Sequence, residues 1–179
     1  DYEIAYLFDK PRYPADVIPF NELRNIVAAA GCQLYQEQCV DQALVNHYAQ
    51  LFGWTQADKD LLLSDSKIRE QVIRFINNNE LTSSNFPNNN SNNNIREYLL
   101  SHHDPTLAAR FIYNIGILKI AHPDWSTARI VATAYLDALA GTVHTILDIC
   151  GLIPAVGEPC DLANGVFYTI EGDGINASL

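Results

Sequence analysis

The residues best suited to chemistry in this chain are its histidines and cysteines, and the closest grouping is a histidine pair beside an aspartate. His102, His103 and Asp104 are consecutive, and His122 follows further along the chain. Imidazole and carboxylate groups bind zinc, iron or manganese. However, adjacent histidines point in different directions on most backbones, and Asp104 precedes Pro105, an arrangement typical of a helix start. We therefore predict no metal site here.

A cysteine beside a base would form a different kind of centre. Cys32 would become a thiol nucleophile if His47 lay next to it. The alternative is that Cys32 packs against Leu34 or Tyr35 as a small apolar residue. The sequence contains no phosphate-binding loop, no dinucleotide-binding fingerprint and no Gly-x-Ser-x-Gly motif. We predict no catalytic residue and no cofactor for this chain.

A third group of ionisable residues depends on a long predicted helix that spans residues 127 to about 149. Its polar residues Asp137, His144 and Asp148 fall on one narrow side when they are placed about 100° apart per residue. Most of the remaining circumference is apolar, which is typical of an amphipathic helix buried on nearly all sides. The alternative is a candidate pH-sensitive stripe, on a helix that inserts into a membrane at acidic pH. Asp137 and Asp148 interrupt the apolar run, so a permanent transmembrane span is not expected.

Size and charge limit the classes of function that remain. The chain has 179 residues, 48% of them hydrophobic, which indicates one domain, or one and a half, with a real core. It begins at Asp1 and contains no methionine, so we expect a processed or excised piece of a longer protein. The formal net charge is −10, and no lysine or arginine follows Arg129. Nucleic-acid binding is not expected, because it needs cations that displace phosphate counterions.

Four cysteines are compatible with two disulfides, and the sequence does not choose among the three pairings. Cys150 and Cys160 flank a segment in which the chain can double back, so this pair is a candidate disulfide. Cys32 and Cys39 would lie roughly 10 Å apart along one continuous helix, too far to bond directly. For this second pair, the sequence is compatible both with two buried free thiols and with a disulfide.

Hydrophobic spacing predicts an all-α fold, a compact multi-helix bundle with an extended N-terminal arm and an Asn-rich loop. Residues 1–20 carry aromatics and prolines with little periodicity and are predicted to be the arm. Residues 21–76 form an N-terminal helical subdomain. Residues 77–94 include ten asparagines and are predicted to be a loop or linker, because they bury too little apolar surface to offset their ordering entropy. Residues 95–179 form a C-terminal helical region.

Local signals mark several helix ends within these regions. A glycine in or just after a helical pattern interrupts or stops it, and a hydroxyl or carboxylate side chain just before a pattern starts it. Thr55 with Asp58 has the spacing of a capping box. The interrupting or stopping glycines are Gly31 and Gly53, and the starting residues are Ser64 or Asp65, Asp104, and Asp124 or Ser126.

The stretch that organises the C-terminal region is predicted to be a helix, a tight buried elbow and a second helix. Glycine and proline at three-residue steps prevent a regular helix from running through the elbow. The second helix gains from an acidic side chain in its first turn, an anchoring tyrosine ring and a glycine at its end. The residues in these structural roles are Gly151, Pro154 and Gly157 in the elbow, and Asp161, Tyr168 and Gly172 in the second helix.

This stretch also resembles a known family. The matching order is Gly-x-Ile-Pro-x-Val-Gly-Glu from Gly151, then Asp161, Asn164 and Tyr168, then Glu171-Gly172-Asp173 and Asn176-Ala177. It is similar to the pre-toxin TG domain of bacterial polymorphic toxins of the contact-dependent type, over residues 125–179. In that family the domain lies between a long secretion or repeat region and a C-terminal toxin domain. The family pattern continues past Leu179 into a second elbow, and Cys150 and Cys160 occupy positions where small or aliphatic residues are expected.

The resemblance implies a non-catalytic helical module of a secreted or cell-surface bacterial toxin, one that links or helps deliver a toxin domain. It implies partners among the neighbouring domains of the parent toxin, together with an immunity or chaperone protein, and it assigns no catalytic residue. Two alternatives remain open at this stage. One is a pH-sensitive translocation segment that inserts into a target membrane, and the other is an unrecognised hydrolase in the N-terminal hundred residues.

Overall fold

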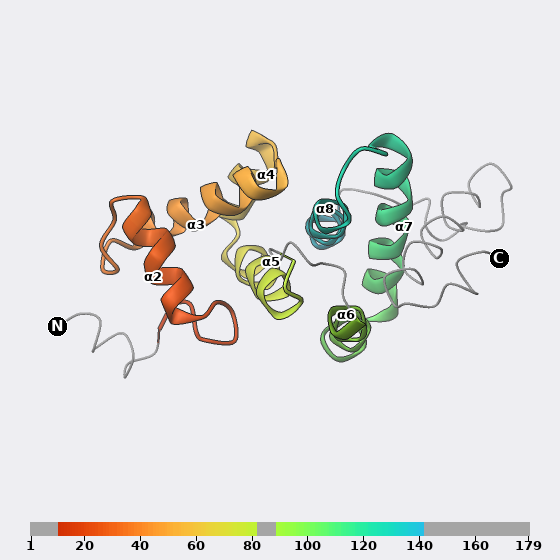
Figure 1. Cartoon of the computed structure of the whole chain (residues 1–179), viewed down its shortest axis with the longest axis horizontal. Coiled ribbons are helices and arrows are strands. Elements are labelled where there is room, and N and C mark those ends of the chain that lie inside the picture. The colour runs from red at the N-terminus through yellow and green to blue at the C-terminus, as the bar shows by residue number, and fades with distance from the viewer. Residues whose placement is uncertain (1–10, 82–88, 142–179) are drawn as a thin grey trace, which may run out of the picture. The chain divides into compact units, whose positions relative to one another are not determined.

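Every regular element in the part of the chain that the computed structural model describes, residues 11–81 and 89–141, is an α-helix (Figure 1). The predicted all-α class is therefore confirmed. The chain divides into two compact units, Asp1–Asn78 and Asn79–Leu179, which are described separately below. The helices are α2 (Phe20–Ala29), α3 (Glu37–Phe52), α4 (Gln56–Ser64), α5 (Ser66–Asn78), α6 (Asn89–His102), α7 (Pro105–Ala121) and α8 (Thr127–Ala140).

The N-terminal unit is a succession of helices in which α3 packs against α2 and α4, and α4 packs against α5. Residues 1–10 of the predicted arm lie outside the described residues. Residues 11–19 form turns, and Val17 and Ile18 are fully buried because the backbone folds back onto the carbonyl of Pro14. This part of the predicted arm is therefore packed into the core. The largest fully buried side chains of this unit are Ile18, Leu23, Leu44, Tyr48, Phe75 and Ile76.

Glycines and caps set the helix ends of this unit as the sequence predicts. Gly31 and Gly53 have φ angles of 77° and 67°, in the left-handed region that glycine adopts without steric cost. Thr55 and Asp58 form both hydrogen bonds of the capping box before α4. Asp65 accepts hydrogen bonds from the backbone of the first turn of α5. These ends leave α2 and α3 as two helices joined by a short connection.

The predicted Asn-rich loop is too long at both ends. Helix α5 continues to Asn78 and helix α6 begins at Asn89, whereas residues 82–88 lie outside the described residues. The amides of Asn77 and Asn78 donate to carbonyls one turn earlier in α5, and Asn77 also donates to the Tyr48 hydroxyl. Bonds of this kind keep asparagine in a helix despite its low propensity, and propensity alone misplaced this boundary.

The C-terminal unit is dominated by the packing of α7 against α8, and α6 also contacts α7. Asp104 and Ser126 accept backbone hydrogen bonds at the starts of α7 and α8, as predicted. Asn114 is 1% exposed between these helices. Its amide donates to the Ala134 carbonyl at 3.3 Å, while its own oxygen has no partner among the described residues. Among the described residues, no helix is both long and apolar enough to cross a membrane.

Helix α8 ends earlier than predicted. Gly141 adopts a φ angle of 66° immediately after Ala140, which closes the helix with a left-handed residue. The expectation of one unbroken helix to about residue 149 is therefore wrong at this point, and residues 142–149 lie outside the described residues. The apolar pattern continues on both sides of Gly141, so hydrophobic spacing alone did not locate the stop.

Replacing Asp104 with alanine tests the cap of α7. The substitution removes the 2.8 Å bond from the Leu107 backbone amide and should lower the free energy of unfolding by about 1 kcal/mol. Urea unfolding followed by the helical circular dichroism signal measures this loss. Asp124→Ala is the matched control, since Asp124 is exposed and caps no helix. Equal losses for the two variants would contradict the assigned role.

Candidate functional site

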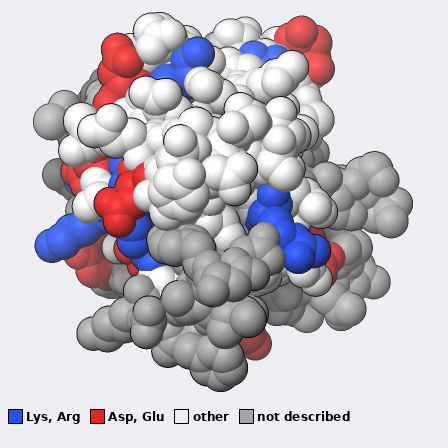
Figure 2. Space-filling view, turned by 90° about the vertical axis from the view of Figure 1, so that its left-hand side faces the viewer, with Lys and Arg blue, Asp and Glu red and all other residues white. Residues whose placement is uncertain are grey.

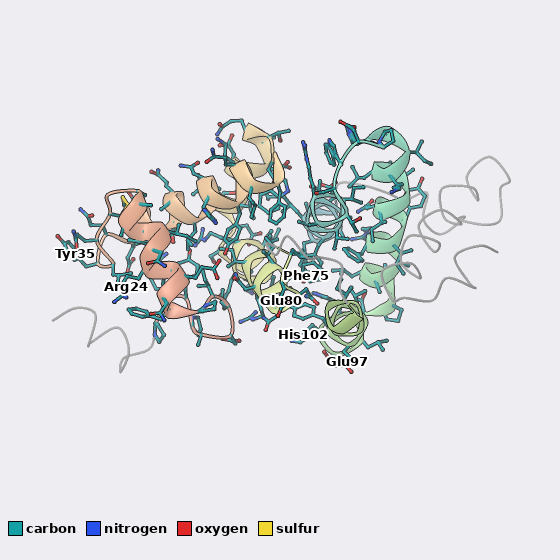
Figure 3. All side chains as sticks on the ribbon, viewed as in Figure 1. Arg24, Tyr35, Phe75, Glu80, Glu97 and His102 are labelled. Atoms are coloured by element: carbon teal, nitrogen blue, oxygen red, sulfur yellow. A yellow bond between two sulfur atoms is a disulfide. The ribbon has the colours of Figure 1, made fainter. Side chains whose placement is uncertain are left out.

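A disulfide between Cys32 and Cys39 closes the connection between α2 and α3 (Figure 3). The two Cα atoms are 5.9 Å apart, within the usual range for a bridge. The sequence left a bridge and two free thiols open, and the structure contains the bridge. The distance argument assumed one continuous helix, whereas α2 ends at Ala29 and α3 begins at Glu37. Because its sulfur is bonded, Cys32 is not a free thiol nucleophile.

The connection carries an exposed aromatic residue between its two cysteines. The Tyr35 side chain is 60% exposed and extends from the loop into solvent (Figure 3). Around it the loop is largely uncharged, and the Gln36 side chain accepts a hydrogen bond from the Gln33 backbone at 2.8 Å. The side of the molecule that carries this loop shows uncharged side chains across much of the view, with charged ones mainly toward the periphery (Figure 2).

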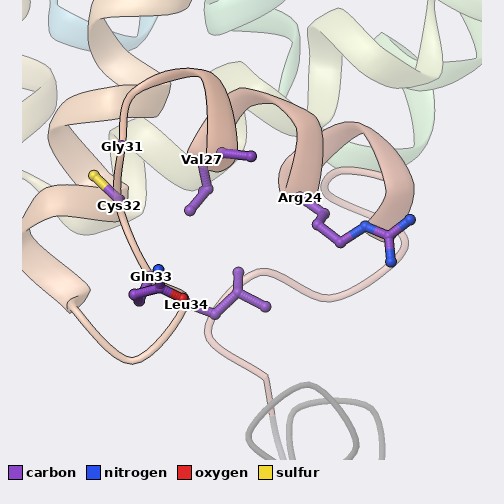
Figure 4. A pocket seen from close by; sticks show the side chains of 7 residues that line it. Arg24, Val27, Gly31, Cys32, Gln33 and Leu34 are labelled. Carbon is purple, nitrogen blue, oxygen red and sulfur yellow. The ribbon is translucent and has the colours of Figure 1, made fainter.

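A hollow of about 250 Å³ lies between the end of α2 and this loop (Figure 4). Gly31 leaves the helix in the left-handed conformation, and a Cβ atom built on it would meet nothing within 4 Å. Arg24 supplies the one cation of the lining, and its guanidinium lies 5.9 Å from the centre of the Phe20 ring. The lining residues are Arg24, Val27, Ala28, Gly31, Cys32, Gln33 and Leu34.

A polar cluster fixes the start of α3, directly after the disulfide. The Asp41 carboxylate accepts hydrogen bonds from Arg12 at 2.7 and 2.8 Å and from the Tyr13 hydroxyl. Arg69 of α5 lies 3.6 Å from the same carboxylate and donates to the Tyr13 hydroxyl at 2.8 Å. The Leu62 carbonyl accepts another bond from Arg69 at 3.1 Å. The cluster thereby ties the first turn and two helices together.

The burial of Arg69 makes the ion pair and hydrogen bonds of this cluster important for stability. Arg69 is 7% exposed, so its positive charge depends on Asp41 for a negative partner. Burial, together with the hydrogen bond to Asp41, raises the pKa of Tyr13 well above the usual range, which keeps the hydroxyl protonated as a donor. The arrangement holds the disulfide-closed loop in place, and its side chains are occupied in bonds to one another. Its role is structural.

Replacing Asp41 with asparagine tests this role. The substitution leaves Arg69 buried without its negative partner and should destabilise the N-terminal unit by about 3 kcal/mol. Thermal and urea unfolding measure the effect. Asp16→Asn is the matched control, because the Asp16 side chain is 66% exposed in its ion pair with Arg74 and should cost less than about 1 kcal/mol. Similar losses of stability for the two variants would contradict the proposed stabilising role of Asp41.

The histidine pair lies at the junction of α6 and α7. His103 Nε2 shares a hydrogen bond with the Tyr135 hydroxyl of α8, and the His102 ring stacks on the Tyr98 ring at a centroid distance of 4.0 Å. Asp104 caps α7 instead of turning toward the histidines. Within the described residues, no group of three or more histidine, cysteine, aspartate or glutamate side chains is placed to hold a metal ion.

The surroundings of His103 favour its neutral form. Burial lowers the pKa of His103, the neighbouring His102 lowers it further, and Asp104 opposes both effects. Among the described residues, the Tyr135 hydroxyl is bonded to His103, and the centre of the Tyr98 ring lies 6.1 Å from the centre of the His103 ring. Because the pKa of the folded state is depressed, the folded state binds fewer protons than the unfolded state. The contribution of His103 to stability is therefore complete above the ordinary histidine pKa and declines as the pH falls.

His103→Gln should flatten the dependence of stability on pH. In the unchanged chain, stability should fall as the pH drops below about 6.5, through the depressed pKa of His103. Glutamine can keep a bond to Tyr135 but does not titrate. Melting temperatures recorded between about pH 7.5 and 5 measure the slope. Asn46→Gln, at an exposed position of α3 without a titratable group, should leave the slope unchanged. An unaltered slope in His103→Gln would refute this assignment.

The remaining sequence-predicted site residues are not brought together. Asp137 lies on α8, whereas His144 and Asp148 of the candidate stripe lie outside the described residues. The single helix that aligned these three positions is broken at Gly141. The other predicted positions outside the described residues are the candidate disulfide cysteines Cys150 and Cys160 and the motif residues Gly151, Pro154, Gly157, Asp161, Tyr168 and Gly172.

No function was predicted from the sequence for the loop between Cys32 and Cys39. Two signals pointed to it. Gly31 stands just before Cys32, and three glutamines, a leucine, a tyrosine and a glutamate separate the cysteines. The glycine favours a break in the helical pattern, and the mainly polar residues favour exposure to solvent.

Comparison of the chain with protein-family models, curated proteins and solved structures gives no match.

Proposed function

We propose that the chain is a non-catalytic helical pre-toxin module of a secreted bacterial polymorphic toxin, which links or helps deliver a C-terminal toxin domain. The observation that carries the proposal is the disulfide between Cys32 and Cys39. Disulfides persist in oxidising surroundings outside the cytosol, which supports a secreted or cell-surface location. The resemblance of residues 125–179 to pre-toxin TG domains supplies the toxin context.

The N-terminal unit has the properties of a docking element in such a module. The disulfide joins residues seven apart, and the Asp41 cluster fixes the helix that follows. A loop held in one conformation loses little entropy when it binds, and tyrosine is well suited to anchor a protein contact. Tyr35, with the hollow beside Arg24, offers such an anchor. Its partners would be a neighbouring domain of the parent toxin, or an immunity or chaperone protein.

Production of the chain in two bacterial compartments tests the proposal. One version carries an export signal and the other remains in the cytosol. We expect no growth arrest from either version, because a connecting module carries no toxic activity of its own. Peptide mapping after alkylation should recover Cys32 and Cys39 as a disulfide from the exported protein and as thiols from the cytosolic protein.

Each contrary result points to a different alternative. Growth arrest in either compartment would place a toxic activity within this chain and favour the unrecognised hydrolase. Free Cys32 and Cys39 in the exported protein would contradict the secreted assignment. Leakage of anionic vesicles when the purified protein is acidified to about pH 4.5 would favour the membrane-inserting alternative, with His103 as a group that charges on acidification.

A further inference from the structure

The turn between α7 and α8 holds an arginine against a tryptophan. The guanidinium carbon of Arg129 lies 3.8 Å from the centre of the Trp125 ring. The His122 ring stacks on the same tryptophan, with 3.8 Å between ring centres and 5° between ring planes. A guanidinium on an indole face gains from cation–π attraction and from stacking. The turn therefore presents this cation in one fixed position.

Arg129 forms no ion pair within 4 Å among the described residues. Its Nε atom is buried and has no hydrogen-bond partner there. By contrast, Arg12, Arg69 and Arg74 each lie within 4 Å of a carboxylate. The Trp125 ring holds the Arg129 side chain in place of an acidic partner. The guanidinium is thus positioned but not neutralised.

The surroundings of this cation combine a second charge with exposed apolar surface. Lys119 lies in the last turn of α7, is exposed, and likewise forms no ion pair within the described residues. Ile120, next to Lys119 in the chain, is 51% exposed, and Asp124 in the turn is an exposed carboxylate. We call Lys119, Ile120, His122, Trp125 and Arg129 the turn patch. These residues belong to the last turn of α7, the turn and the first turn of α8, on a chain whose net charge is −10.

We propose that the turn patch binds an acidic segment of a partner protein, with a carboxylate against Arg129 and an aliphatic side chain against Ile120. A guanidinium binds a carboxylate through two parallel hydrogen bonds, and the geometry is better defined when the guanidinium is already fixed. Tryptophan and arginine dominate the energetics of protein interfaces. This inference does not depend on the proposed function.

Charge argues for a protein partner and against a polyanion. Binding to nucleic acid requires many cations along one surface, because each phosphate contact displaces a counterion. The turn patch offers two cations and a histidine next to the exposed carboxylate of Asp124, and the chain as a whole is strongly negative. One or two carboxylates next to an aliphatic residue match both the number of cations and the exposed Ile120.

Calorimetric titration of the full chain tests this inference. The probe is a short peptide of glutamate and leucine, and the comparison peptide has glutamine in place of each glutamate. We expect the acidic peptide alone to bind and to change the fluorescence of Trp125. Arg129→Gln should weaken binding about tenfold or more. Arg129→Lys should recover only part of it, because an ammonium group does not form the paired bonds of a guanidinium.

The matched control is Lys67→Gln, which removes an exposed cation of α5 in the N-terminal unit and should leave peptide binding unchanged. Circular dichroism shows whether each variant is folded, and Lys119→Gln replaces Arg129→Gln if the latter is not. Equal binding of the two peptides would overturn the proposal. Equal weakening by Lys67→Gln and Arg129→Gln would also overturn it. So would binding of single-stranded DNA or anionic vesicles at Arg129 without binding of the acidic peptide.

Discussion

The described N-terminal unit depends on one constraint, the need to neutralise a buried guanidinium. Arg69 is almost completely covered, and a covered charge is tolerated only beside an opposite charge with its hydrogen bonds satisfied. Asp41 supplies that charge from α3, while Tyr13 and Arg12 complete the set of bonds from the first described turn. Three segments far apart in the sequence are therefore joined at one point. Cys39 of the disulfide lies two residues before Asp41, so this junction also restricts the position of the exposed loop.

The C-terminal unit is organised differently, because apolar packing between α7 and α8 provides most of its described interior. Polar side chains are concentrated where these helices begin and end. At one end, His103 meets Tyr135, and burial favours a neutral imidazole there. At the other end, the Arg129 guanidinium lies over the face of the Trp125 ring. The same helix pair thus carries one group that acid perturbs and one group suited to recognising an anion. Neither group belongs to a metal site or to a nucleophilic arrangement within the described residues.

Features encoded over a few residues could be predicted from the sequence, whereas features that join distant residues could not. The caps at Thr55, Asp104 and Ser126 follow from spacing and side-chain chemistry alone. The bridge between Cys32 and Cys39 stayed undecided, because a stripe of apolar residues continues across the break between α2 and α3. Asparagine side chains that bond to the backbone extend α5, and the left-handed conformation of Gly141 ends α8. The hydrophobic periodicity of the sequence indicates neither feature. The stacking of Arg129 on Trp125 could not be predicted, because it depends on how the two side chains are oriented in the folded structure. The C-terminal motif lies outside the described residues.

Asn114 has a consequence for how α7 and α8 recognise each other. Its amide is bonded to the Ala134 carbonyl across a mainly apolar contact, in which Arg110 of α7 also donates to the Ala138 carbonyl at 3.3 Å. If one helix slid along the other by a turn, this bond would break and the amide would face hydrocarbon, at a cost that aliphatic neighbours would not impose. A single polar side chain can in this way define the register of two helices, as a buried asparagine does in coiled coils. The pairing of α7 and α8 is therefore specific as well as hydrophobic, and the buried amide, with the Arg110 bond to Ala138, favours one alignment.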